Sequence, residues 1–401
     1  MESIDADWEI TESMRILIAS DCYKLNTNGV TVVILGLSDG LRQRGHEVKV
    51  LSLSNTRHSF RDGDDYYIRS LPSLFYPDVR TSLARKDPLI EEIVAWKPDI
   101  VHLHTDGSAH HLAVEIAERC GVPLVKTCHT YYDYYVFGRF RDLSPVKAFS
   151  GFVGGRLYKP ADAVTVPSRK ATEFPFLHKL RDQLLVIPNG LELEKYRNRF
   201  SFEERRAFRA SLGIGDHTGV LVAVTRLSRE KNIEDLISFF PLVHQNHPDV
   251  KMLLVGDGPD RKKLEKQAEK LNLPGSVIFS GRVPPEEVWQ YYAAGDVYVS
   301  ASTFEVHSMS YLEAMTNGLP LLCHADESLD GVLEHGWNGF IWHSGEEYAD
   351  YACRLLDDES LREEMSLRSC QRAEKFSDEA FVSNMIGVYE SVLCENGKGN
   401  E

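Results

Sequence analysis

The sequence predicts an α/β protein with two doubly wound domains, each built on a mostly parallel sheet. Two observations carry this prediction. Short apolar runs recur between turn residues and are followed by helix-like stretches, and the runs of the first half begin at Arg15, Val48, Ile100, Leu124 and Ala163. Runs that are apolar throughout indicate parallel strands buried on both faces. The series then starts again, with runs that begin at Leu221, Met252, Val277, Val297 and Leu319.

The length and composition agree with two domains, because 401 residues with 43% hydrophobic and 26% charged content can form two cores. We expect an acidic extension over residues 1–13, an N-terminal domain over 14–186 and a C-terminal domain over 187–376. Residues 377–401 are expected to form a helix that packs back onto the first domain, followed by a tail. The domains are expected to face a cleft that binds ligands.

Composition excludes several classes of protein. A formal charge of -15 argues against nucleic-acid binding, which needs clustered Lys and Arg. The seven cysteines contain no CxxC pair, so we expect neither a disulfide framework nor a zinc ribbon. The N-terminus has no apolar core, and no run approaches the ~18 apolar residues of a membrane span. No GxGxxG motif follows the first strand, which argues against a nicotinamide cofactor. These features favour a cytoplasmic protein.

No metal is expected either. His102 and His104 alternate along a predicted strand, whereas His110 and His111 are adjacent and would point apart on a helix, so this group of histidines is not interpreted as a metal site. No Asp-x-Asp triplet follows a predicted strand, and the acidic pairs at 64–65 and 357–358 are interpreted as solvated charges. These residues therefore give no indication of a metal site, and no cofactor is expected.

Two glutamates eight residues apart, Glu305 and Glu313, follow the predicted strand VYVSAS. In a helix, eight residues rise about 12 Å, close to the span of a nucleotide-sugar from its hexose to its ribose. Ser308, Met309 and Ser310 are expected to begin the next helix, where free N–H groups suit a diphosphate. The alternative is that Glu305 only complements the helix dipole and Glu313 faces water.

Two cations, Arg226 and Lys231, follow another predicted strand in VTRLSREKNIEDLI. Placed over the same cleft, they would neutralise a leaving diphosphate. The alternative is a pair of solvated loop charges, as we expect for the intervening Arg229 and Glu230.

In their order along the chain, the motifs resemble the retaining glycosyltransferases of the GT-B, family 4 type. The matches span nearly the whole sequence: NGV at Asn28, HT at His129, IPNG at Ile187, R-x4-K at Arg226, VGDGP at Val255, and E-x7-E at Glu305 followed by AMTNGLP. The resemblance implies two Rossmann-like domains and transfer of a sugar from a nucleotide-sugar donor with retained anomeric configuration.

The resemblance also implies a role for each matching residue. Gly29 lies where the family brings a glycine backbone close to the donor diphosphate, because no Cβ intervenes. His129 corresponds to the histidine beside the transferred hexose. Arg226 and Lys231 correspond to the phosphate-binding cations. Val283 corresponds to the residue whose backbone reads the nucleobase.

For the glutamates, the resemblance implies that Glu305 binds the hexose and Glu313 the ribose. Two positions depart from the family pattern. Many relatives have Gly where this chain has Ser308, and Gln or Phe where it has His307. Both positions pack against the donor in the family, so His307 is expected to shape the pocket, and the identity of the sugar stays open.

The resemblance implies front-side substitution, in which the departing diphosphate helps to deprotonate the acceptor. No carboxylate partner for double displacement is evident near His129. Cations and helix amides then stabilise the leaving group.

The segment from Arg139 to Arg181 bears on the acceptor, because it holds nine Lys or Arg against three Asp or Glu. Phenylalanines are interleaved with these charges at positions 137, 140, 149 and 152. Such a surface favours docking on anionic lipid headgroups. The segment resembles its counterpart in bacterial diacylglycerol glucosyltransferases. The alternative is a solvated helical hairpin. The run YYDYY at Tyr131 is either an acceptor wall or packing.

The sequence therefore predicts a cytoplasmic enzyme, peripheral on the inner face of the plasma membrane, that transfers glucose from UDP-glucose to a lipid or another hydroxylated acceptor. Within enzymes, the alternative is transfer to a protein, polysaccharide or sugar-phosphate, with GDP-mannose as another donor. Outside this class, the alternatives are a non-catalytic nucleotide-sugar-binding subunit and a nucleotide-sugar epimerase.

Overall fold

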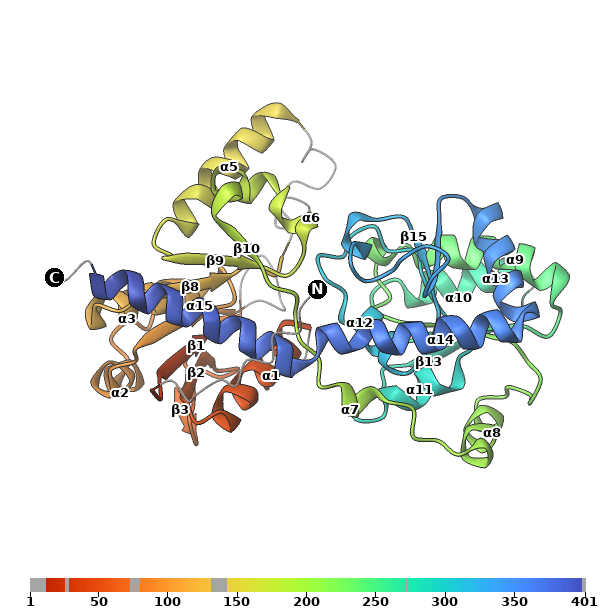
Figure 1. The fold of residues 1–401 in the computed structure, drawn as a ribbon, viewed down its shortest axis with the longest axis horizontal. Helices are drawn as coiled ribbons and strands as arrows, with labels where there is room; N and C mark the ends of the chain where they lie inside the picture. Colours follow the sequence, from red (N-terminus) through yellow and green to blue (C-terminus); the bar gives the residue numbers. More distant parts are fainter. Residues whose placement is uncertain are drawn as a thin grey trace, which may run out of the picture. The chain divides into compact units, whose positions relative to one another are not determined.

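The computed structural model describes residues 12–25, 29–72, 80–130, 143–271, 273 and 275–398. The chain divides into two compact units. Unit 1 is built from the chain up to Gly190 and from Asp378 onward, and unit 2 is Leu191–Ser377. Each unit contains a largely parallel sheet with helices (Figure 1), which confirms the predicted α/β class.

Unit 1 is centred on a sheet whose described strands follow the order β10-β9-β8-β7-β1-β2-β4-β3. Its pairs are parallel except β3 with β4. The direction of winding reverses between β1 and β7, the place where doubly wound sheets bind ligands. The strands are β1 (Arg15–Ala19), β2 (Glu47–Leu53), β3 (Phe60–Asp62), β4 (Asp65–Ile68), β7 (Ile100–Leu103), β8 (Leu124–Thr127), β9 (Ala163–Val166) and β10 (Leu184–Val186), with a separate antiparallel pair β5 (Leu71–Pro72) and β6 (Arg80–Thr81).

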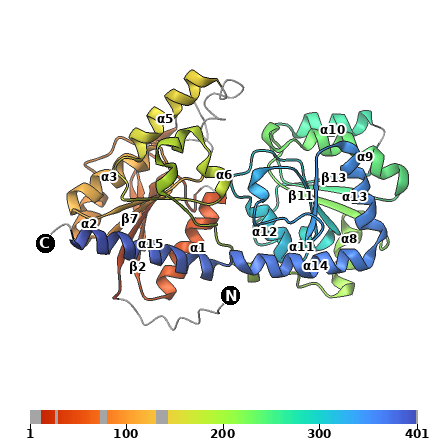
Figure 2. The ribbon, with the colours of Figure 1, turned by 45° about the horizontal axis from the view of Figure 1, so that its top comes forward.

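The helices of unit 1 connect these strands and end with the last helix of the chain. α15 packs against α1, and Figures 1 and 2 both show the two helices side by side. The helical segments are α1 (Gly29–Gln43), α2 (Pro88–Trp96), α3 (Ser108–Cys120), α5 (Ser144–Tyr158), α6 (Arg169–Thr172), the 3-10 segment η2 (Pro175–Gln183) and α15 (Asp378–Lys398).

Unit 2 contains a parallel sheet in the order β13-β12-β11-β14-β15-β16. Numbered along the chain this is 3-2-1-4-5-6, the order of dinucleotide-binding sheets, with the reversal between β11 and β14. The strands are β11 (Val220–Val224), β12 (Lys251–Val255), β13 (Val277–Gly281), β14 (Val297–Ser300), β15 (Leu321–His324) and β16 (Gly339–Trp342).

Helices cover this second sheet, and side-chain caps encode the first turns of some of them. Ser201 and Glu204 form a reciprocal capping box at α8, and Ser344 and Asp358 cap α13 and α14. The helical segments of unit 2 are α7 (Leu193–Tyr196), α8 (Phe202–Ser211), η3 (Arg229–Lys231), α9 (Ile233–Asn246), α10 (Arg261–Lys270), α11 (Val288–Ala294), α12 (Met309–Thr316), η4 (Glu327–Leu329), α13 (Gly345–Asp357), α14 (Glu359–Ala373) and η5 (Glu374–Phe376).

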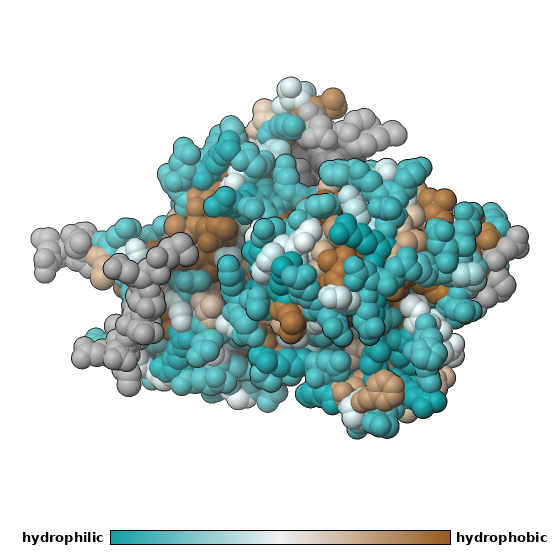
Figure 3. All heavy atoms as spheres, turned by 45° about the vertical axis from the view of Figure 1, so that its right-hand side comes forward, coloured by the Kyte–Doolittle hydropathy of each residue, from teal (hydrophilic) through white to brown (hydrophobic). Residues whose placement is uncertain are grey.

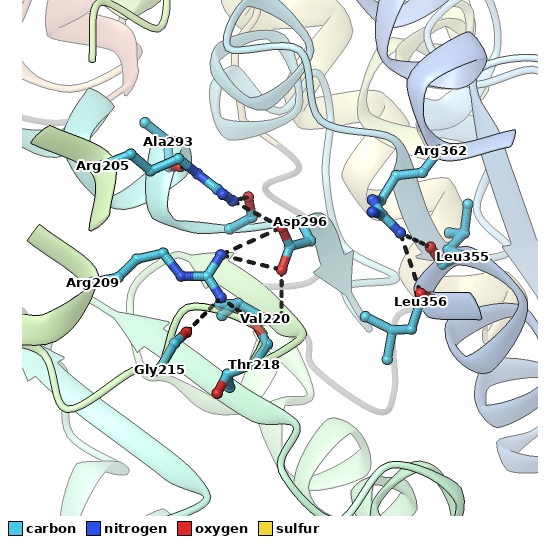
Figure 4. A network of polar contacts seen from close by, with 11 residues as sticks. Arg205, Arg209, Gly215, Thr218, Val220, Ala293, Asp296, Leu355, Leu356 and Arg362 are labelled. Atoms are coloured by element: carbon cyan, nitrogen blue, oxygen red, sulfur yellow. Dashed lines mark hydrogen bonds and ion pairs between the residues drawn. The ribbon is translucent and has the colours of Figure 1, made fainter. Parts of the chain in front are cut away.

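An ion cluster at the start of β14 ties α8 to the sheet of unit 2 (Figure 4). Asp296 accepts hydrogen bonds from the backbone N–H of Val220 at 2.8 Å and from Arg205 Nη2 at 2.8 Å. Arg209, which is only 3% exposed, approaches the same carboxylate at 3.5 Å. A buried cation is tolerated when a carboxylate compensates it, so Asp296 holds both arginines in place.

The two units have separate apolar cores. In unit 1, side chains from β1, β2 and β7 pack with those of α2 and α3, and in unit 2 the core gathers residues from β11, β12, β14, α9 and α13. The face drawn in Figure 3 is mostly hydrophilic, with its hydrophobic residues in separate patches.

Candidate functional site

The predicted acidic and basic residues of unit 2 meet where its sheet reverses. Lys231 follows β11 and Glu305 follows β14, and these two strands are neighbours. Lys231 Nζ donates to Glu305 Oε1 at 2.5 Å, and the two side chains are 22% and 13% exposed. The ligand-binding edge of the sheet therefore carries a partly buried ion pair. Arg226 lies five residues before Lys231 on the same loop and is exposed.

The turn GDGP after β12 supports this loop from behind. Leu227 donates its N–H to Asp257 O at 3.1 Å, and Asp260 donates its N–H to Leu227 O at 3.0 Å. Gly256 has φ +132, and a Cβ there would clash with Thr225 O, while a Cβ on Gly258 would clash with Leu227 O. Both glycines are needed because the two backbones run in contact. VGDGP thus fixes the path of the chain between Arg226 and Lys231.

Asn232 joins the loops that follow β11 and β14. Its backbone is left-handed, with φ +49. Its Nδ2 donates to Ala301 O at 3.2 Å and to Thr303 Oγ1 at 3.4 Å. This contact fixes the loop that carries Lys231 against the loop that carries Glu305. The sequence analysis missed Asn232, because its partners lie about 70 residues away and its side chain makes no capping hydrogen bond to α9 in the described chain.

The helical rise of about 12 Å considered between Glu305 and Glu313 does not apply, whereas the helix expected to begin at Ser308 to Ser310 is present as α12. Glu305 lies in the loop after β14, and α12 begins only at Met309, so Glu313 lies about one turn into the helix. Ser308 is the N-cap residue, but in the described chain its side chain makes no capping hydrogen bond to the first turn. Instead Ser308 Oγ lies 3.1 Å from Ser310 Oγ. The start of α12 thus keeps backbone N–H groups that suit an anion.

Glu313 is partly buried and does not simply face water. Tyr292 OH donates to its Oε2 at 2.7 Å, and Tyr196 also hydrogen-bonds to the carboxylate. Burial raises the pKa of Glu313 to about 6, although the two tyrosines lower it in part. The sequence analysis missed both tyrosines, since they come from α7 and α11 and no local pattern links them to α12.

His307 lies between the two glutamates in sequence, with its ring beside Phe376 at a centroid distance of 5.5 Å. Both ring nitrogens are shielded from solvent, and no hydrogen-bond partner for them lies among the described residues. Burial lowers the pKa of His307 to about 4, so the ring is neutral near pH 7. Val283 lies two residues after β13, at the same edge of the sheet, and is half-buried.

The remaining two predicted residues, Gly29 and His129, belong to unit 1. Gly29 is the first residue of α1, directly after the reversal strand β1 and its loop, and it is exposed. His129 follows β8 by two residues, and its Nε2 lies 2.9 Å from His104 Nδ1. The tyrosine run at 131–135 and Phe137 and Phe140 lie outside the described residues.

Comparison with protein families decides the class of protein. Residues 27–195 match the model "Glycosyltransferase Family 4" and residues 204–372 match the model "Glycosyl transferases group 1". The chain belongs to the family 4 glycosyltransferases. The predicted family is thereby confirmed, and the protein is a sugar transferase.

Curated relatives of this glycosyltransferase include two alpha-monoglucosyldiacylglycerol synthases. The one from Acholeplasma laidlawii is 27% identical over 96% of this chain and 99% of its own length. The one from Streptococcus pneumoniae is 28% identical over 92% of this chain and 87% of its own length.

Solved structures confirm the GT-B fold of the glycosyltransferase. HepE from Anabaena, crystallised with UDP and glucose, superposes with a TM-score of 0.73 at 22% identity, covering 94% of this chain and all of that one. Sucrose-phosphate synthase from Thermosynechococcus elongatus superposes with a TM-score of 0.73 at 20% identity, covering 95% and 99% of the two chains.

Two further findings concern the described part of the glycosyltransferase. It contains no group of three or more His, Cys, Asp or Glu residues arranged to hold a metal ion. Its helices include none that is both long and apolar enough to cross a bilayer.

The basic and aromatic segment of the glycosyltransferase contains α5 and η2, which pack closely together. The buried face of α5 consists of Ser150, Gly151, Gly154 and Tyr158, and a Cβ on Gly154 would clash with Phe176 O. The opposite face carries Phe149 and Phe152, which are 58% and 55% exposed. In a solvated amphipathic helix the large apolar residues face inward. In α5 three small residues and Tyr158 face inward, whereas Phe149 and Phe152 face solvent.

Proposed function

We propose that this glycosyltransferase transfers glucose from UDP-glucose to a membrane lipid such as diacylglycerol, with the α-configuration retained and without a metal. The observation that carries the proposal is the Lys231–Glu305 ion pair, at 2.5 Å, beside the start of α12. A cation, a carboxylate and free helix amides then meet at one edge of one sheet. These groups match the diphosphate and the hydroxyls of a nucleotide-sugar.

Each group has a proposed task in binding the donor. Arg226 and Lys231 neutralise the diphosphate as it leaves, and Glu305 accepts a hydrogen bond from a hexose hydroxyl. Donors placed where charge develops lower the barrier without reorganisation. The amides of Met309 and Ser310 at the start of α12 hold phosphate oxygens.

The nucleoside end of the donor is proposed to bind farther along the same edge. Glu313 accepts the ribose hydroxyls, and the Val283 backbone contacts the base. His307 shapes the sugar pocket through its neutral ring and its packing on Phe376. The choice of UDP is supported by the UDP-bound HepE structure, which shares the fold.

In unit 1, Gly29 and His129 are proposed to act on the same donor, Gly29 at the diphosphate and His129 at the hexose. Substitution is proposed to occur on the front face, with the leaving diphosphate taking the proton of the acceptor hydroxyl. The cations and amides then do the work of charge stabilisation, so no metal is required.

A lipid acceptor is supported by the outward-facing aromatic residues of α5. Phe149 and Phe152 lie on the same exposed face as Arg156, and Lys179 of η2 lies over the Phe152 ring at 5.5 Å. Exposed aromatic rings flanked by cations are typical of surfaces that insert into anionic headgroups. The names of the relatives agree, since both alpha-monoglucosyldiacylglycerol synthases carry a lipid acceptor in their names. We therefore propose a cytoplasmic location, peripheral on the inner face of the plasma membrane.

The test is transfer of radiolabelled glucose from UDP-glucose to vesicles that contain diacylglycerol and anionic phospholipid. We expect a chloroform-soluble glycolipid whose anomeric proton shows the α-linkage by NMR, formed equally well in EDTA. UDP-, GDP- and ADP-sugars are compared by thermal shift, because ligands of the native state raise its apparent stability. A glycosylated product formed only with soluble acceptors would contradict the lipid proposal, and a response only to GDP-mannose would contradict the donor.

The docking surface is tested separately from the chemistry. Replacing Phe149 and Phe152 by Ser should weaken vesicle binding, and binding of the wild type should fall as salt rises. The matched control is Leu367→Ser, which removes an exposed apolar side chain from α14 of unit 2 and should leave vesicle binding intact. Vesicle binding that is independent of salt and of both phenylalanines would refute the assigned surface.

A further inference from the structure

A row of buried polar side chains lies behind His129 in unit 1. His104 follows β7 directly and is only 2% exposed. Its Nδ1 lies 2.9 Å from His129 Nε2, and the two rings are nearly parallel, at 12°. The pair joins the carboxyl ends of two adjacent strands, β7 and β8.

The ring of His102 packs against the ring of His104. The rings of His102 and His104 lie 4.1 Å apart at an angle of 39°. His102 is itself fixed at both nitrogens, because Nδ1 lies 2.7 Å from Tyr389 OH and Nε2 lies 2.7 Å from Thr127 Oγ1. Tyr389 comes from α15, so the last helix of the chain contributes to the same row.

Burial keeps both rings of this row uncharged. The pKa of His102 is lowered to about 3 by burial and by the nearby His129. The pKa of His104 is lowered well below its usual value by burial, then by His102 and His129. A neutral imidazole has one N–H donor and one acceptor nitrogen. The position of that single proton in His104 decides which way the hydrogen bond to His129 runs.

The second nitrogen of His104, Nε2, indicates which of the two ring nitrogens carries the proton. Its Nε2 is buried, and no hydrogen-bond partner for it lies in the described part of the chain. In protein backbones, buried N–H groups without an acceptor are rarer than buried acceptors without a donor, and we apply the same preference to this imidazole. The favoured tautomer therefore carries the proton on Nδ1, where it donates to His129 Nε2.

We propose that His104 is a positioning residue that fixes the ring and the tautomer of His129 by donating its Nδ1–H to His129 Nε2. His129 Nε2 then accepts, and a neutral His129 carries its proton on Nδ1. The ring would offer a donor, not an acceptor, to a hexose hydroxyl. The catalytic consequence rests on the proposed function, whereas the tautomer of His129 is independent of it.

The first measurement is made on the wild-type protein, so its result does not depend on whether a His104 variant folds. Imidazole ¹⁵N chemical shifts of the full-length wild type report which nitrogen of each histidine is protonated, and comparison with His129→Asn assigns the His129 signals. We expect a protonated Nδ1 and a hydrogen-bonded, unprotonated Nε2. A His129 ring that is protonated on Nε2 would overturn the proposal, whatever the enzyme transfers.

The second measurement compares two substitutions of His104 in glucosyl transfer. His104→Leu removes the donor, and we expect kcat to fall about 10–100-fold, by analogy with residues that orient the ligands of metal sites, with a smaller change in KM. His104→Asn places an amide N–H near the position of Nδ1 and should restore most of kcat. An Asn variant as impaired as the Leu variant would refute a hydrogen-bonding role.

A double-mutant cycle separates positioning from a general structural effect. In the His129→Ala background, His104→Leu should cause no further loss of kcat, because the residue through which it acts is gone. Losses that multiply would show that His104 acts independently of His129 and would overturn the proposal. Absence of transfer from any nucleotide-hexose by the wild type, with the expected His129 tautomer, would reject the proposed function alone.

Discussion

Replacing Glu313 by Gln is expected to stabilise unit 2 near neutral pH while impairing donor binding. Burial raises the pKa of this carboxyl from 4.5 to about 6. The folded protein therefore holds the Glu313 proton more tightly than the unfolded chain does. Ionisation above pH 6 costs more in the folded state, and this cost disappears in the Gln variant. Gln keeps the oxygen that accepts from Tyr292.

The size of the effect follows from the two pKa values. A difference of about 1.5 pKa units corresponds to about 2 kcal/mol of unfolding free energy when both states are ionised. The sign of the effect follows from the raised pKa of Glu313. In the wild type, the contribution of Glu313 to the free energy of unfolding is greatest below pH 4.5 and is lost as the pH rises through 6. The gain from Gln should therefore grow from about 0.8 kcal/mol at pH 5 to about 2 kcal/mol at pH 8.

Calorimetry of wild type and Glu313→Gln between pH 5 and pH 8 measures this difference. For a unit of 150–250 residues, about 2 kcal/mol corresponds to a rise in Tm of roughly 4–8 °C. Glu363→Gln is the matched control, since Glu363 is exposed on α14 of the same unit and should give no gain that depends on pH. A Glu313→Gln variant that is less stable than wild type at pH 8, or equally stabilised at every pH, would refute the reasoning.

Three further substitutions test the site and its support. Lys231→Ala should lower kcat by roughly 10²–10³-fold, the usual cost of one lost electrostatic contact in a transition state. The control Arg229→Ala, in the same loop, should leave kcat unchanged. Equal kinetics of the two variants would contradict the role of Lys231. Glu305→Ala should abolish transfer with an unaltered circular dichroism spectrum, and retained turnover would remove its assigned role. Asp296→Asn leaves the buried Arg209 without its carboxylate partner and should lower the free energy of unfolding by about 3–5 kcal/mol, as measured by urea titration. An unchanged urea midpoint of unfolding would show that the ion cluster in Figure 4 contributes little to the stability of unit 2.

The regular elements were predictable where a local pattern encodes them. The runs at Ile100, Leu124 and Leu221 were predicted as strands because most of their side chains are apolar, as is typical of buried parallel strands. The sequence analysis missed the described strands β3, β4, β5, β6, β10 and β16. β4 reads DYYI, and its Asp65 and tyrosines are buried only because neighbouring elements cover them. The sequence of one strand does not show which other elements will bury it.

The candidate site shows the same division. The sequence indicated Glu305 and Lys231 as parts of two motifs 74 residues apart, but it did not predict that their side chains are in contact. The distance between Glu305 and Glu313 was taken from the rise of a helix, whereas the backbone at Glu305 follows a loop. That loop is set by Asn232 at Ala301, a contact between distant parts of the chain.

By itself, the sequence determined the α/β class, the two successive sheets, the family and the kinds of side chain at their edges, because apolar periodicity and motif order are local properties. The tertiary structure alone decided which of these side chains meet. Lys231 reaches Glu305 because β11 and β14 are adjacent at the reversal of the sheet, and His104 reaches His129 because β7 and β8 are paired. Strand order is set by packing over the whole domain, so charge pairing, burial and the resulting pKa values follow from it.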